Sequence, residues 1–195
     1  FAETLLPLLD KNIDKSIKKA EEMLGEFATL YESSWISNMG RKLGIDTPKI
    51  TDKNLIEEFL NLMQSNELDF NNSFYYLSFL VGNDKNEIET SSNNQKILST
   101  IQSSDWYIKW KTRLNINKKN SQKILKILLI NNPSIVPRNH IVEKVLNDAI
   151  NENKKDIFND FLNALNEPYK IRIFDDPYTK PPLPNEEVNQ TFCGT

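Results

Sequence analysis

The most constraining feature of this sequence is a stripe of apolar residues that recurs at steps of three or four over residues 17–43. Its members are Ile17, Ala20, Leu24, Phe27, Tyr31, Trp35, Met39 and Leu43. This spacing places the whole set on one face of an α-helix and does not fit the alternation of a β-strand. The stripe predicts a helix that starts near Asp14 and ends at a C-cap glycine, Gly44. Gly25 leaves open whether it is one helix or two.

The chain up to residue 167 shows the same periodicity in shorter segments. Apolar residues at helical spacing occur in 55–63, 74–80, 97–101, 106–114, 124–130, 142–149 and 157–165. Only 5 of the 195 residues are glycine, which favours helices joined by Asn, Pro and Asp over a sheet with many tight turns. We therefore predict an all-α fold, in which residues 1–167 form an array of amphipathic helices.

The helical pattern disappears at Pro168. Residues 168–195 hold five of the nine prolines, including the run Pro181-Pro182-Leu183-Pro184. Proline fixes φ and lacks an N–H group, so it favours an extended chain. We predict a second region, residues 168–195, as a proline-rich tail that lies over the helices or hangs free and ends in Thr-Phe-Cys-Gly-Thr.

Charge and hydropathy argue against two classes of partner. The formal net charge is −3, so the chain lacks the basic excess that attracts nucleic acids and anionic membranes. Trp106 and Trp110 lie four residues apart beside lysines, and this spacing is more typical of a buried helix face than of base stacking. No segment has the apolar length of a membrane span. We expect no nucleic-acid partner and no membrane partner.

The sequence lacks the motifs of common catalytic and metal sites. It has no glycine-rich phosphate loop, and its one histidine, His140, and one cysteine, Cys193, do not suffice for a zinc site. Two predicted helices and the tail separate these residues, which disfavours a nucleophile–base pair. A single cysteine also excludes an internal disulfide and is compatible with a reducing compartment. We predict no catalytic, cofactor-binding or metal-binding residue here.

Adjacent acidic residues are the remaining acid/base candidates. The pairs are Glu21-Glu22, Glu57-Glu58 and Asp175-Asp176. Neighbouring residues on a helix point in different directions, which disfavours the first two pairs. We expect the third pair to be exposed in the tail, where solvation opposes the shifted pKa values that catalysis needs.

A polar loop between two apolar helices, residues 131–140, contains three asparagines, two prolines, Arg138 and His140. Such a loop is typical of a pinned turn whose side chains satisfy the backbone groups at helix ends. The alternative, which the sequence leaves open, is that Arg138 contacts a neighbouring domain, since loops often carry function.

Several strings resemble the SelO (selenoprotein O) family and follow that family's order. They are Met39-Gly40-Arg41-Lys42-Leu43-Gly44, Asn132-Pro133-Ser134-Ile135-Val136-Pro137-Arg138-Asn139-His140, Asn166-Glu167-Pro168-Tyr169 and Thr191-Phe192-Cys193-Gly194-Thr195. The resemblance implies a nucleotidyltransferase with a protein-kinase-like (pseudokinase) fold, which uses ATP and Mg²⁺ to transfer AMP to hydroxyl groups of proteins. The ATP-binding and Mg²⁺-binding residues of that family lie N-terminal to the region matched here.

The resemblance further implies that this chain is the C-terminal, non-catalytic part of such an enzyme and binds no cofactor itself. The chain starts at Phe1 without an initiator Met, and we expect a kinase-like core to precede it. The implied partners are that core and the protein substrates of the longer parent, in the cytoplasm of a bacterium. A second hypothesis stays open: a stand-alone helical protein-interaction module with no enzymatic activity.

Cys193 is the one position with a role implied by the resemblance. It matches a family cysteine, replaced by selenocysteine in some eukaryotic members, which is implicated in redox control through a disulfide to the kinase-like core. Since the chain has no second cysteine, a partner thiol would belong to the missing part or to another molecule. The alternative is an inert cysteine in the tail.

Overall fold

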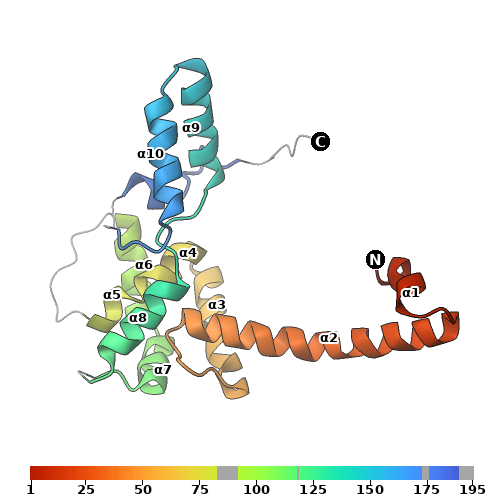
Figure 1. Cartoon of the computed structure of the whole chain (residues 1–195). Helices are drawn as coiled ribbons and strands as arrows, with labels where there is room; N and C mark the ends of the chain where they lie inside the picture. Colours follow the sequence, from red (N-terminus) through yellow and green to blue (C-terminus); the bar gives the residue numbers. More distant parts are fainter. Residues whose placement is uncertain (83–91, 118, 173–175, 189–195) are drawn as a thin grey trace.

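The computed structural model describes residues 1–82, 92–117, 119–172 and 176–188. Every regular element within these ranges is a helix, which confirms the predicted all-α class. Figure 1 shows a long helix that projects to the right from a compact body, and a helical hairpin that stands above that body. None of the described helices combines the length and the apolar character that a membrane crossing needs.

The predicted stripe forms one continuous helix, α2 (Ile13–Lys42), which Gly25 does not interrupt. The side chain of Asn12 caps its start by accepting a hydrogen bond from the Lys15 N–H at 3.1 Å, as a good N-cap residue does. The prediction for the other end is also confirmed. Gly44 follows the helix with φ +83°, a left-handed conformation that favours glycine.

The apolar stripe of α2 is covered at one end only. Leu43 is fully buried in the body, whereas Phe27 is 63% exposed. The short helix α1 (Ala2–Leu9) folds back on the first turns of α2, where the Ser16 hydroxyl donates to the Leu6 carbonyl. We call α1 together with residues 13–31 of α2 the limb; it extends away from the body (Figure 1).

The body packs the C-terminal part of α2 against a group of shorter helices. They are the 3₁₀ turn η1 (Ile50–Asp52), α3 (Lys53–Ser65), α4 (Phe70–Tyr76), α5 (Phe79–Gly82), α6 (Ser92–Ser103), α7 (Asp105–Leu114) and α8 (Ser121–Asn131). Their apolar faces meet in one core. Within it, Trp106 stacks on Phe59 and on Trp110, with ring centroids 4.2 and 5.6 Å apart. The interpretation of this tryptophan pair as core is confirmed.

The last two helices, α9 (Asn139–Asn151) and α10 (Lys155–Asn166), form an antiparallel hairpin with a small core of its own. Part of the predicted tail lies at its base. The 3₁₀ turn η2 (Pro177–Thr179) places Tyr178 against Phe161, with ring centroids 5.0 Å apart, and Thr179 is buried. Cys193 lies outside the described residues.

Candidate functional site: the Arg138 anchor

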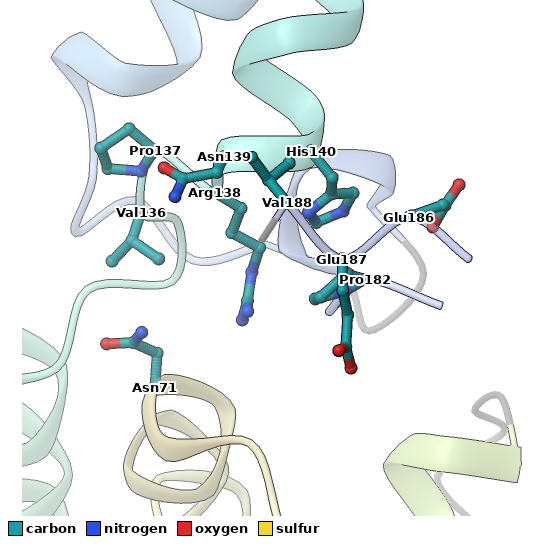
Figure 2. Close-up of a pocket in the computed structure, with 10 residues that line it drawn as sticks. All are labelled: Asn71, Val136, Pro137, Arg138, Asn139, His140, Pro182, Glu186, Glu187 and Val188. Atoms are coloured by element: carbon teal, nitrogen blue, oxygen red, sulfur yellow. The ribbon is translucent and has the colours of Figure 1, made fainter. Parts of the chain in front are cut away.

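The polar loop before α9 directs Arg138 toward α4, the helix that carries Asn71 in Figure 2. The guanidinium binds the Asp69 carboxylate through two hydrogen bonds, Nη1–Oδ2 at 2.7 Å and Nη2–Oδ1 at 2.8 Å. Nη2 also donates to Asn72 Oδ1 at 3.1 Å. Asp69 in turn caps α4 by accepting the Asn72 N–H at 2.8 Å. This bidentate geometry gives the strongest kind of protein ion pair.

The Arg138–Asp69 pair is largely shielded from water, because the two side chains are only 9% and 16% exposed. Removing two charges from water is costly, and the paired geometry with the added Asn72 contact offsets that cost. The two residues are 69 positions apart in sequence. Their contact therefore joins the base of the hairpin to the body and fixes the orientation of one on the other.

The same face of α4 also holds the C-terminal segment. Asn72 Nδ2 donates to the Thr179 carbonyl at 3.1 Å. The Tyr75 hydroxyl donates to the Arg172 carbonyl at 3.2 Å and accepts the Arg172 N–H at 3.0 Å. Burial raises the pKa of Tyr75, so it remains a neutral donor. We call Arg138, Asp69, Asn72, Tyr75 and Arg172 the Arg138 anchor.

The loop itself is a pinned turn, as predicted. Asn132 Nδ2 donates to the Lys42 carbonyl at the end of α2, and Asn131 Nδ2 donates to the Ile127 carbonyl in the last turn of α8, both at 2.8 Å. Ser134 Oγ donates to the Lys170 carbonyl at 2.7 Å. Side chains of the loop thus satisfy helix ends and the first residues after α10. The guanidinium of Arg138 has its partners on α4.

An open pocket of about 490 Å³ lies beside the anchor. Asn71, His140, Pro182, Glu186 and Glu187 are among the residues that line it (Figure 2). Burial lowers the pKa of His140 and outweighs the opposite effect of the Glu186 carboxylate, so the imidazole is mainly neutral at pH 7. Arg138 also lines the pocket, but its guanidinium is paired with the Asp69 carboxylate. The pocket therefore offers carboxylates and a neutral imidazole rather than an electropositive cradle for phosphates.

The predicted acidic candidates divide into confirmed and corrected cases. Glu58 lies on the solvent side of α3 and binds Lys109 at 2.8 Å in an exposed ion pair, as expected for a solvated helix face. The exposure predicted for Asp176 is wrong, because its side chain is only 18% exposed. It binds Arg172 at 3.3 Å and accepts the Tyr178 N–H at 2.9 Å. Its neighbour Asp175 lies outside the described residues.

Sequence reasoning missed most of the anchor. Of its members, only Arg138 is a candidate in the sequence analysis. The spacing of Asp69, Asn72 and Tyr75 at steps of three could have indicated one polar strip on α4. Within the described part of the chain, no cluster of three or more His, Cys, Asp or Glu residues could hold a metal ion.

The sequence of this chain is similar to those of a known protein family. A family model described as "Protein adenylyltransferase SelO" matches residues 1–166. Proteins named "Protein nucleotidyltransferase YdiU" from Alkaliphilus metalliredigens and Clostridium perfringens are each 35% identical to the chain, and one from Clostridium botulinum is 36% identical. Each alignment covers 100% of this chain and 38% of the relative. The chain thus spans less than half the length of these relatives.

Proposed function

Because this chain belongs to the SelO family of protein nucleotidyltransferases, we propose that it is the helical, non-catalytic part of an enzyme that transfers AMP from ATP to protein hydroxyl groups. The observation that carries the proposal is the alignment, which runs along the whole chain yet covers only 38% of each relative. The remaining length of such a protein would hold the ATP-binding and Mg²⁺-binding groups that the family resemblance places outside these residues.

The carboxylates described here do not fit a Mg²⁺ site. Mg²⁺ needs several oxygen ligands in an octahedral arrangement. Among the described ion pairs, the two most buried carboxylates, Asp52 and Asp69, bind the guanidinium groups of Arg113 and Arg138. An arginine at this distance competes with a cation for the same oxygens. In our proposal, the metal and the phosphate chemistry therefore belong to the catalytic part.

The role proposed for this chain is structural support and positioning of the C-terminal segment. The body supplies a packed core, in which each large apolar side chain contributes roughly 1.5–3 kcal/mol by burial. The Arg138 anchor holds two points of the C-terminal segment, Arg172 and Thr179, on that body. Loss of the chain would lower the stability of the catalytic part, and loss of the anchor would release the segment that precedes Cys193.

The test uses the complete protein with Mg²⁺ and ATP labelled at either the α- or the γ-phosphate. We expect protein-bound label from α-labelled ATP only, since AMP transfer retains the α-phosphate and releases the γ-phosphate in pyrophosphate. Deletion of residues 1–195 should abolish stable labelling. Full and stable activity after deletion would contradict the supporting role. Absence of α-label from the intact protein would favour the alternative, a helical interaction module without enzymatic activity.

We further propose that Cys193 regulates the enzyme through its redox state, as the family resemblance implies. Labelling by the wild-type protein should differ between oxidised and dithiothreitol-reduced samples, because a disulfide would restrain the C-terminal segment against the catalytic part. The variant Cys193→Ser should label equally in both conditions. A redox response that persists in this variant would assign the effect to another thiol.

A further inference from the structure

The limb carries an apolar face that no other described element covers. Five large side chains on α2 are between 59% and 63% exposed: Met23, Leu24, Phe27, Leu30 and Tyr31. At about 100° per residue, they fall within about a third of the helix circumference. Single exposed apolar residues are common, but a contiguous patch of this kind marks an interaction surface.

The spacing on this face specifies the kind of structure that fits it. From Ile17 to Tyr31 the apolar positions advance by three, four, three and four residues. This is the pattern of helices that pack side by side at a crossing angle of about 20°. The rings of Phe27 and Tyr31 lie side by side on this face with centroids 6.0 Å apart. The geometry therefore fits a second helix that runs along α2.

Within the described chain, α1 covers only the beginning of the limb. It packs on the first turns of α2, where Ser16 is fully buried. Its own Leu8 is 81% exposed, so α1 also carries an exposed apolar side chain. Phe1 lies at the start of α1, and Figure 1 places the N-terminus beside the limb, away from the body. Polypeptide joined to Phe1 would begin beside the limb.

Resting on the function proposed above, we propose that a helix from the catalytic part of the same polypeptide packs along the Met23–Tyr31 face of α2. The relatives have more than half of their length outside the aligned region, which supplies the occupant. A covalently linked segment has an effective local concentration in the millimolar range. It therefore occupies the face in preference to a second copy of the protein at micromolar concentration.

In this arrangement α2 is shared between two units. Its C-terminal end is part of the body core, with Ile36 and Leu43 almost fully buried, and its N-terminal end completes the core of the catalytic part. A single helix with 30 residues then transmits the position of one unit to the other without a flexible linker.

The test is photo-crosslinking in the complete protein, with benzoylphenylalanine in place of Phe27. The matched control places the same group at Ile108, which is 66% exposed on α7 but has the polar neighbours Lys111 and Thr112 on its side of the helix. We expect crosslinks from position 27 to a peptide outside residues 1–195 of the same molecule, at least tenfold above those from position 108.

Two results would overturn the proposal. A crosslinked dimer would identify a second copy as the occupant, and crosslinking from position 27 no stronger than that from position 108 would show that the face is uncovered. Labelling of the wild-type protein from α-labelled ATP is measured in parallel. If the protein is labelled but the intramolecular crosslink is absent, only the docking proposal is refuted. If the crosslink forms but no label is transferred, only the proposed AMP transfer is refuted.

Discussion

The two ends of α2 belong to one apolar stripe and have opposite surroundings. At the body end, Leu43 is fully buried and its carbonyl accepts the Trp110 indole N–H at 2.8 Å. At the limb end, Phe27 belongs to the same apolar stripe and is 63% exposed. The comparison teaches that the repeat determines which face of a helix is apolar, while the rest of the fold determines whether this face finds a partner.

Trp110→Ala should lower the free energy of unfolding more than any other substitution proposed for this chain. It tests whether the core at the body end of α2 is the main source of the chain's stability. The side chain is fully buried, and its loss leaves a cavity beside Trp106 and an unpaired carbonyl at Leu43. We expect the free energy of unfolding to fall by about 4 kcal/mol. Urea unfolding followed by circular dichroism measures it.

Ile108→Ala on the exposed side of α7 is the control for this experiment. The side chain is 66% exposed, so its truncation should change the free energy of unfolding by less than about 0.5 kcal/mol. If the two variants unfold alike, the body core is not the main source of stability, and the contrast between the two ends of α2 loses its physical basis.

Arg138→Met should have the second-largest effect on the free energy of unfolding. It tests whether the Arg138 anchor makes the α9–α10 hairpin part of the body. The substitution keeps an apolar stem but leaves the Asp69 carboxylate, only 16% exposed, without its arginine. We expect a loss of about 3 kcal/mol. Protease cleavage within α9 and α10 should also become faster, since the contact that joins the hairpin to α4 is gone. Limited trypsin digestion with mass spectrometry measures the cleavage rate.

Lys109→Met serves as the matched control, because it removes an exposed partner of Glu58 with the same change in side-chain chemistry. An exposed ion pair contributes at most about 1 kcal/mol. Equal losses from Arg138→Met and Lys109→Met would indicate that the anchor is an ordinary surface pair and that the hairpin is held by its apolar contacts alone.

Local patterns made the helices predictable, and long-range contacts made the anchor unpredictable. The four-residue spacing of Trp106 and Trp110 and the C-cap glycine at position 44 are local signals. Each involves residues within one or two helical turns, so a single sequence is enough to recognise it. The Arg138–Asp69 contact joins residues 69 positions apart, and no local signal pairs them. For Asp176 the proline-rich context indicated an exposed tail, but contacts with Arg172 and Phe161 folded that segment onto the helices.

The same substitution at the two glycines of α2 should have opposite signs. A Cβ atom at Gly40 would lie 2.6 Å from Pro48 Cβ, so Gly40→Ala forces the body apart and should cost about 2 kcal/mol. At Gly25 no atom lies within 4 Å of the added Cβ. Gly25→Ala should therefore stabilise the helix by up to about 1 kcal/mol. Thermal unfolding of both variants measures the difference. Destabilisation by Gly25→Ala would mean that another segment packs against α2 at that residue.

Acid should affect the body through Asp52. Burial raises the pKa of its carboxyl, but the Arg113 guanidinium at 2.6 Å and the Lys49 N–H at 2.7 Å outweigh it, so the pKa lies below the usual value. A lowered pKa in the folded state gives stability that is present above the unfolded-state pKa, near 4, and is lost as the pH falls through the folded-state pKa. The effect is modest, because Arg113 remains 36% exposed.

Asp52→Asn removes the titrating group and tests this assignment. The variant should be less stable than the wild type at pH 7, and the difference should shrink as the pH falls from 5 toward 2. Urea unfolding at a series of pH values gives the two slopes. If the wild type and Asp52→Asn lose stability in parallel over this range, the acid sensitivity arises from other carboxylates.

Phe27→Ala should have the smallest effect in the chain of residues 1–195, and this is the sharpest test of the comparison. Its ring contacts only Tyr31 among the described aromatic side chains, so truncation should change the free energy of unfolding by less than about 0.5 kcal/mol. If a helix of the catalytic part covers the face in the complete protein, the same substitution becomes a core truncation there and should cost about 3 kcal/mol. An equal, small effect in both proteins would mean that the two ends of α2 differ permanently and that the limb face stays in water.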